Sequence, residues 1–304
     1  MELDLSALMT EKRNEQTVNI DQLSTLEIIQ LMNKEDQGVA LAVQKCLPEI
    51  EQATNEIYQA LKNGGRLFYL GAGTSGRLGV IDASECPPTF RTEPSLVQGI
   101  MAGGTKAIIT AVEGVEDNPF EGKNDLKKAN FQKGDALVGI AASGRTPYVY
   151  GGIEYANSLG ATTIALTANQ NSELGDIAQI AIEVLVGPEV LTGSTRLKAA
   201  SAHKMVLNML STTTMIKLGK VYENLMVDLN ASNVKLKERA KNIVMSVTGA
   251  REEVAETSLN QANSDVKAAI VMIKGNVDYQ QALLLLQQSE GFVRKAIERA
   301  QAHH

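Results

Sequence analysis

Glycines and hydroxyl side chains gather in a short stretch, Gly71 to Gly76, with the sequence Gly-Ala-Gly-Thr-Ser-Gly. Glycine lets the backbone bend tightly and approach a ligand closely, and Thr74 and Ser75 add hydroxyl donors. The residues before it, Leu67 to Leu70, are apolar and aromatic, as in a buried parallel strand. A helix that begins after this loop would point free N–H groups at the same place. The stretch therefore predicts a phosphate site that includes Gly73 and the two hydroxyl residues.

The same spacing satisfies the G-x-G-x-x-G pattern of dinucleotide-binding domains. Such a domain continues with a helix of several turns and a second strand, and an acidic residue follows about 20 residues on. Here Pro87-Pro88 predict an early end to the helix, and the next strand candidate, Leu96 to Met101, runs into Ala-Gly-Gly without a carboxylate. A monophosphate is therefore favoured over a nicotinamide cofactor.

A second loop of similar composition follows the apolar run Ala136 to Ala141, in a Ser-Gly-Arg-Thr-Pro turn. Ser143 and Thr146 offer hydroxyls, Gly144 allows close approach, and Arg145 could add a charge, although an exposed arginine is usually only solvated. These residue types make up any strand-to-helix turn, so one loop alone would indicate little. Two such loops, each after a strand, favour a shared phosphate or sugar site.

Strand and helix patterns alternate between Leu67 and Leu185, which predicts a parallel sheet covered by helices on both faces. The expected fold is an α/β, three-layer αβα sandwich. Its strands are expected at residues 67–70, 96–101, 136–141, 162–166 and 180–185, with helices at 106–112 and 148–158. Ligands bind such sheets at the carboxyl ends of the strands, where both loops would lie.

Helical patterns flank this alternation. Ser24 and Glu27 form a capping box before one long amphipathic pattern that runs through Val43, and Pro48 fits the first turn of a second helix. A helix expected from Thr195 to Leu218, which nearby hydroxyl residues could cap, has a Met and Leu stripe typical of a core or a dimer surface. We therefore expect three parts: an N-terminal helical segment, residues 1–55; the sheet domain, 56–222; and a C-terminal helical domain, 223–304.

Composition narrows the functional class. The 304 residues have a formal net charge of -6 without a basic cluster, which argues against nucleic acid as a partner and favours a small molecule. Cys46 and Cys86 are too few for a disulfide framework or a four-ligand zinc site, and no cofactor or metal is expected. The N-terminus has no signal-peptide pattern and no apolar run could span a membrane, so the sequence predicts a cytoplasmic protein. His203 is expected to be packed or exposed, and His303-His304 could be native or a tag.

Several long motifs occur in the order found in one family. They are GAGTSGRLGVIDASECPP from Gly71, MAGG from Met101, AVEGVEDN from Ala111, IAASGRTPY from Ile140, VGPEVLTGSTRLK from Val186, NLMVDL from Asn224, TEKRN from Thr10 and LSTLEI from Leu23. Together they resemble the N-acetylmuramic acid 6-phosphate etherases over nearly the whole chain. One departure is visible from Lys198 to Lys204, where the expected Lys-Ala-Gly-Thr-Ala-Gln-Lys reads Lys-Ala-Ala-Ser-Ala-His-Lys.

The resemblance implies a five-stranded sugar isomerase domain, a homodimer and a metal-free lyase. This enzyme would split N-acetylmuramic acid 6-phosphate into N-acetylglucosamine 6-phosphate and D-lactate in cell-wall sugar recycling. The reaction needs proton transfers that two carboxylates can divide, and Glu85 and Glu116 match the two catalytic glutamates of the family. Composition alone barely separates Glu116 from Glu113. The alternative is a non-catalytic sugar-phosphate-binding regulator, similar to the glucokinase regulatory proteins.

Overall fold

The computed structural model describes residues 8–229 and 234–302. His303 and His304 lie outside the described residues. The chain forms two compact units: Met1–Ser84 with Pro94–Ser211, and Glu85–Glu93 with Thr212–His304. The first unit contains the sheet and the second contains the C-terminal helices. The domain boundaries expected at residues 55/56 and 222/223 stay a prediction.

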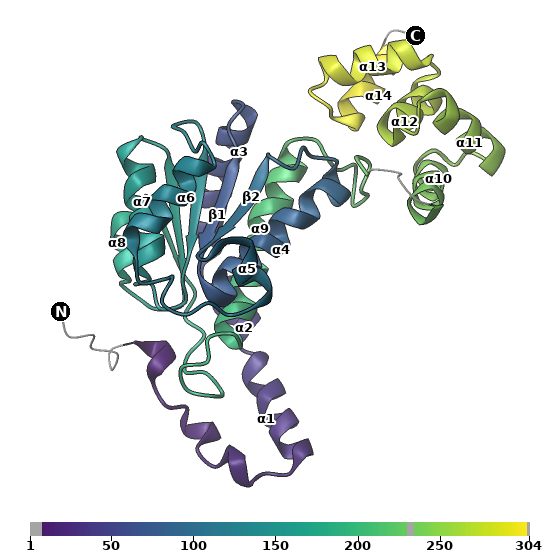
Figure 1. Ribbon diagram of the computed structural model, residues 1–304. Helices are drawn as coiled ribbons and strands as arrows, with labels where there is room; N and C mark the ends of the chain where they lie inside the picture. Colours follow the sequence, from purple (N-terminus) through teal and green to yellow (C-terminus); the bar gives the residue numbers. More distant parts are fainter. Residues whose placement is uncertain (1–7, 230–233, 303–304) are drawn as a thin grey trace. The chain divides into compact units, whose positions relative to one another are not determined.

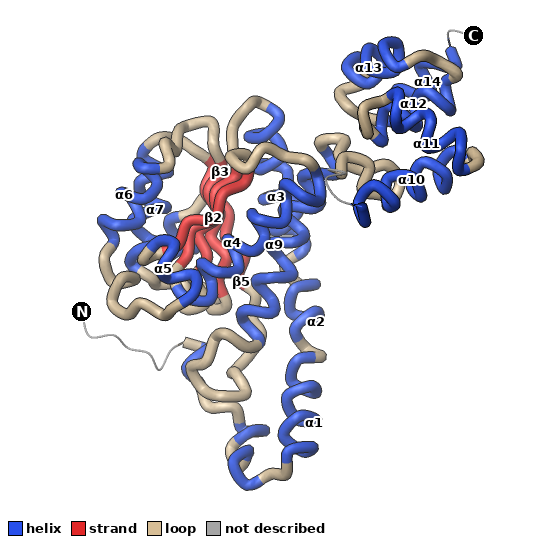
Figure 2. The backbone as a smooth tube through the Cα atoms, turned by 45° about the vertical axis from the view of Figure 1, so that its right-hand side comes forward, coloured by secondary structure: helices blue, strands red, loops and turns tan. Residues whose placement is uncertain are grey.

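The sheet has five parallel strands, which confirms the expected number and direction (Figures 1 and 2). They are β1 (Leu67–Gly71), β2 (Val97–Met101), β3 (Ala136–Ile140), β4 (Thr162–Thr167) and β5 (Ile180–Glu183), in the order β2-β1-β3-β4-β5. The three central strands are almost wholly buried, because helices cover both faces of the sheet. Parallel strands covered in this way read as continuous apolar runs, which is why their positions were predictable.

Helices on the two faces complete an αβα sandwich (Figure 1). One face carries α6 (Pro119–Lys128), α7 (Pro147–Ser158) and α8 (Glu173–Ile177); the other carries α3 (Leu47–Lys62), α4 (Gly73–Phe90) and α9 (Lys198–Lys217). Side chains of β1 alternate between the layers: Phe68 and Leu70 join the apolar cluster of α7, whereas Tyr69 lies against Gly79 of α4. The expected three-layer fold is confirmed.

The N-terminal segment contains three short 3-10 turns, η1 (Met9–Glu11), η2 (Glu15–Thr17) and η3 (Ile20–Gln22), followed by α1 (Thr25–Asp36) and α2 (Val39–Gln44). The capping box of Ser24 and Glu27 is present at the start of α1, and Pro48 lies in the first turn of α3, as expected. The single long helix was a wrong prediction, because the helix is interrupted between Asp36 and Val39, at Gly38, and α1 buries none of its side chains.

Helix α4 contradicts the expected early stop, because it continues through Pro87 and Pro88 to Phe90. Each proline removes one N–H from the helical ladder, so the carbonyls of Ala83 and Ser84 lose their usual partners. The helix resumes beyond them, since the N–H of Arg91 donates to the carbonyl of Pro87. Burial of Cys86 and Phe90 on this stretch supports the continued helix despite the lost bonds.

The C-terminal helices form an apolar core of their own, as the helical pattern predicted. They are α10 (Val234–Thr248), α11 (Glu252–Gln261), α12 (Val266–Gly275), α13 (Tyr279–Gln288) and α14 (Val293–Ala302). The central helix, α12, contacts the other four and begins at Asp265, whose carboxylate accepts the N–H of Ala268. The remaining helix, α5 (Gly104–Ile109), follows β2 in the first unit. Within the two described ranges, no helix combines the length and apolarity needed to cross a bilayer.

Candidate active site

The two predicted loops leave neighbouring strands at the point where the strand order reverses. β1 pairs with β3, and Gly71 lies opposite Ile140 at their carboxyl ends. The chain passes from β1 to α4 on one face and from β3 to α7 on the other (Figure 1). The loops therefore diverge, which is the arrangement that forms a ligand crevice in open parallel sheets.

Two glycines of the first loop, Gly73 and Gly76, have different structural roles. Gly73 has a left-handed φ of 53°, and a Cβ at this position would meet nothing within 4 Å, so the backbone here is open to a ligand. A Cβ on Gly76 would lie 2.5 Å from the Cβ of Met101, so this glycine serves the packing of α4 against β2. Thr74 and Ser75, in the first turn of α4, are partly exposed. Their N–H groups belong to the free end of the helix.

The second loop is held by short local contacts. The N–H of Arg145 donates to Ser143 Oγ at 3.3 Å, and Gly144, with φ 73°, has no room for a Cβ, which would lie 2.4 Å from the Cβ of Ser172. Thr146 is the N-cap of α7, but its hydroxyl makes no capping bond. Arg145 forms an ion pair with Glu173 at 3.5 Å, so part of its charge is already neutralised.

Glu116 is fixed by its backbone beside this second loop. Its carbonyl accepts the N–H of Tyr148, in the first turn of α7, at 3.0 Å. The close approach of α6 to α7 maintains this contact: a Cβ on Gly122 would lie only 1.9 Å from the carbonyl oxygen of Tyr148. The carboxylate of Glu116 is exposed, and so is that of Glu113, in the same loop between α5 and α6.

Glu85 lies in the last two turns of α4 and is also exposed. It belongs to the second compact unit, whereas Glu116 and both loops belong to the first. The structure thus brings the second loop and Glu116 together, and the pairing of the two glutamates stays a prediction. Cys86, next to Glu85, is buried, as is typical of a cysteine that packs in a protein interior.

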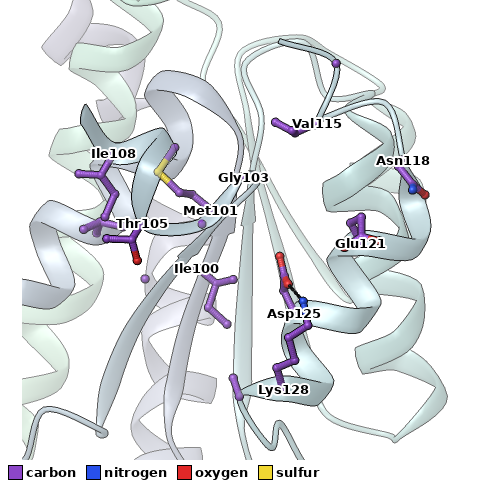
Figure 3. A pocket seen from close by; sticks show the side chains of 15 residues that line it. Ile100, Met101, Gly103, Thr105, Ile108, Val115, Asn118, Glu121, Asp125 and Lys128 are labelled. Carbon is purple, nitrogen blue, oxygen red and sulfur yellow. Dashed lines mark hydrogen bonds and ion pairs between the residues drawn. The ribbon is translucent and has the colours of Figure 1, made fainter. Parts of the chain in front are cut away.

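A cavity of about 740 Å³ lies at the outer edge of β2, between α5 and α6 (Figure 3). Its lining includes residues from two family motifs, MAGG and AVEGVEDN: Met101, Gly103, Gly104, Gly114, Val115 and Asn118. Three of these glycines have left-handed φ angles, which only glycine adopts without strain. Both motifs therefore shape the loop that carries Glu116, whereas the predicted phosphate residues lie outside this cavity.

The cap of α9 is a residue that sequence analysis missed. Glu189, whose side chain is fully buried, accepts the N–H groups of Lys198 and Ala199, both at 2.9 Å. Burial raises the pKa of this carboxyl group, and the two backbone N–H groups oppose the rise. The expected hydroxyl cap is replaced by a carboxylate nine residues upstream, a separation that no local capping pattern covers. Lys198 is buried and paired with Glu35 at 2.7 Å, so it is occupied structurally.

His203 on α9 is fully buried. Burial lowers the pKa of its imidazole to about 4, against a weaker opposing effect of the neighbouring Thr167 backbone. Within the part of the chain described, neither ring nitrogen has a hydrogen-bond partner of ordinary geometry. The packed alternative is therefore confirmed. No group of three or more potential ligands among the described residues could hold a metal ion.

The buried imidazole predicts an acid-sensitive fold. The pKa of His203 is lower in the folded protein than in the unfolded chain, where it is 6.5. The unfolded chain therefore binds a proton first as the pH falls, and the fold loses stability between pH 6.5 and 4. Between pH 7.5 and 4.5 this group alone should remove about 2.5 kcal/mol. His203→Gln cannot gain this charge, so its unfolding free energy should fall less than that of the wild type over that range. Parallel pH curves from denaturant unfolding would contradict the prediction.

Comparison with known proteins extends the sequence resemblance to full length. The chain is 55% identical to the N-acetylmuramic acid 6-phosphate etherase of Bacillus subtilis, covering 97% of each chain. It is 56% identical to etherase 2 of Vibrio cholerae, covering 97% of this chain and 96% of the relative. Residues 49–157 match the glucokinase regulatory protein N-terminal SIS domain, and residues 111–217 match the SIS domain.

A solved structure shows the same fold at lower identity. The phosphoheptose isomerase of Neisseria gonorrhoeae is 19% identical, with a TM-score of 0.50, and the match covers 63% of this chain and 98% of the isomerase. This likeness establishes the fold alone, which is that of the sugar isomerase (SIS) domain. The identity of more than half of the residues over nearly the full length establishes the closer relationship: the chain belongs to the family of N-acetylmuramic acid 6-phosphate etherases.

Proposed function

We propose that this protein cleaves the D-lactyl ether of N-acetylmuramic acid 6-phosphate to give N-acetylglucosamine 6-phosphate and D-lactate, in cell-wall sugar catabolism. The observation that carries the proposal is the sequence identity of 55% and 56%, over 97% of the chain, to two proteins named for this activity. Two loops at the switch point of the sheet, with glycines and hydroxyl side chains, support phosphate binding there. A cytoplasmic location stays a prediction.

The proposed reaction is an elimination followed by water addition. A base removes the C2 proton of the open-chain sugar, the C3–oxygen bond breaks with the electron pair going to lactate, and an acid protonates the departing oxygen. Water then adds at C3 while a base takes one of its protons, and C2 of the resulting enolate regains a proton, which gives N-acetylglucosamine 6-phosphate. We assign the acid to Glu85 and the base for water to Glu116; the group that removes the C2 proton is left open. The substrate phosphate is bound by Gly73, Thr74 and Ser75 and by the second loop, Ser143 to Thr146.

The direct test incubates the purified protein with N-acetylmuramic acid 6-phosphate and measures D-lactate and N-acetylglucosamine 6-phosphate, which should form in equal amounts. A second candidate function, sugar-phosphate-dependent regulation of a partner, is favoured by the match of residues 49–157 to the glucokinase regulatory protein domain. Tight binding of the sugar phosphate without D-lactate release would overturn the etherase proposal in favour of the regulator.

Ser143→Ala is expected to weaken substrate binding. The hydroxyl of Ser143 would donate a hydrogen bond to a charged phosphate, a bond that contributes about 1.5 to 3 kcal/mol. The Michaelis constant should therefore rise by roughly 10- to 150-fold. Thr146→Val should act in the same direction, because the hydroxyl of Thr146 makes no capping bond. Unchanged Michaelis constants in both variants would show that these hydroxyls do not bind the phosphate.

We also propose a homodimer with α9 near the subunit boundary. Met205 and Met209, one turn apart on this helix, are each 38% exposed although both are large apolar side chains. Light scattering at micromolar concentration should give twice the chain mass, and Met209→Asp should reduce it towards the monomer because a charge would be buried. Ser201→Asp, which adds the same single negative charge at an exposed polar position of the same helix, is the control for charge alone. A monomeric, fully active wild type would remove the proposal.

A further inference from the structure

A buried carboxylate joins α4 to β1 and α9 inside the first unit. Asp82 on α4 is 6% exposed and accepts three side-chain hydrogen bonds. Tyr69 of β1 donates its hydroxyl at 2.8 Å, Asn208 of α9 donates its amide at 2.8 Å, and Ser211 of α9 donates its hydroxyl at 3.1 Å. One side chain thus ties the helix to two other elements.

Burying the carboxylate of Asp82 costs free energy, which its hydrogen bonds must offset. Burial raises the pKa of Asp82, while the hydrogen bonds from Tyr69, Ser211 and Asn208 oppose that rise. A buried carboxylate is tolerated only when its oxygens are satisfied, and an arrangement that turns or slides α4 would break these bonds together. The network therefore selects one rotation of α4 about its axis. A purely apolar contact would fix that rotation less sharply, because it has no preferred direction.

Asp82 occupies a particular place on the helix. It precedes Glu85 by three residues, so the two side chains are neighbours on one face of α4. The helix is weakened around Glu85, because Pro87 and Pro88 cannot bond to the carbonyls of Ala83 and Ser84. The side-chain network lies directly before this stretch.

We propose that Asp82 is a positioning residue, which fixes the rotation of α4 from Asp82 onward and thereby the direction of the Glu85 carboxyl group. The proposal rests on the proposed function, in which Glu85 is the acid. Asp82 itself does not contact the substrate. Loss of the network should disturb the step that uses Glu85. Phosphate binding by the two loops should stay intact, because Gly76 and Gly79 pack the first half of α4 against Met101 and Tyr69 without Asp82.

The experiment compares Asp82→Ala with Asp82→Asn. An amide at this position can keep the network, since its oxygen can accept from Asn208 and Ser211 while its nitrogen donates to the Tyr69 oxygen. Asp82→Ala should lower kcat by about 100-fold, the usual cost of a misplacement of about 1 Å. The Kd for N-acetylglucosamine 6-phosphate should stay within about twofold, because the close packing of Gly76 on Met101 and of Gly79 on Tyr69 holds the first turns of α4 without Asp82. Asp82→Asn should recover most of kcat.

Ser211→Ala, which removes a single donor, keeps the test usable if Asp82→Ala fails to fold. It should give a smaller loss of kcat at an unchanged Kd, with a melting temperature that confirms the folded state. Unchanged kcat in both Ser211→Ala and a folded Asp82→Ala variant would overturn the proposal. So would a parallel loss of kcat and sugar-phosphate binding in Asp82→Ala and Asp82→Asn, because that pattern indicates a general structural role.

Glu85→Gln serves as the reference that separates this inference from the proposed function. If Glu85→Gln turns over normally, the assignment of the acid fails, and the positioning role fails with it. If Glu85→Gln is inactive while Asp82→Ala keeps its normal kcat, the proposed function stands and only the role of Asp82 is lost.

Discussion

Glu85→Gln is expected to stop D-lactate release. Lactate leaves as an alkoxide unless its oxygen is protonated, and an alkoxide is a poor leaving group at neutral pH, so the step depends on a positioned carboxylic acid. Glutamine retains the size of the side chain but carries no transferable proton. The loss should be about 10²- to 10⁴-fold in kcat, the usual contribution of general acid catalysis, and C3 oxygen exchange with labelled water should stop as well.

The matched control is Glu93→Gln, an exposed glutamate of the same Glu85–Glu93 segment. It should turn over normally, because it has the same charge and a similar location but no assigned role. Sugar-phosphate binding should be unchanged in both variants. Normal activity of Glu85→Gln would show that another group protonates lactate, and inactivity of both variants would indicate a general effect of charge on this segment.

Local sequence patterns predicted the sheet correctly. They failed at positions where the structure depends on packing between residues far apart in the sequence. Strand β1 is buried on both faces, so its apolar run identified it directly. The end of α4 could not be read in this way, because Pro87 and Pro88 would stop an isolated helix, whereas burial of Cys86 and Phe90 supports this one. The break before α2 was missed for the complementary reason: the apolar pattern continues across Gly38 although the helix does not.

The candidate site shows the same division. Ser143 and Thr146 could be placed from sequence, because a loop that joins a parallel strand to a helix lies at a known edge of the sheet. Glu189 could not, since its partners, the N–H groups of Lys198 and Ala199, are brought to it only by the fold. Asp82 likewise depends on residues of β1 and α9 that lie 13 to 129 positions away in the sequence.

Glu116→Gln is expected to lose turnover while it still exchanges the C2 proton of the substrate. In the proposed mechanism this residue acts late, as the base that takes a proton from the incoming water. A carboxylate can accept that proton and an amide cannot, so the loss in kcat should again be about 10²- to 10⁴-fold. Proton removal at C2 precedes that step, so deuterium from the solvent should still enter the recovered sugar, as measured by NMR.

Glu113→Gln decides whether the residue has been assigned correctly. Both glutamates lie in the loop between α5 and α6, and both are exposed, so the two variants remove the same charge from nearly the same place. The backbone distinguishes them: the carbonyl of Glu116 accepts the N–H of Tyr148 at 3.0 Å, which holds this residue beside the second phosphate loop. A base must be held in place to be effective, so Glu113→Gln should remain active. Inactive Glu113→Gln with normal Glu116→Gln would move the base three residues along the loop and break the correspondence with the family motif.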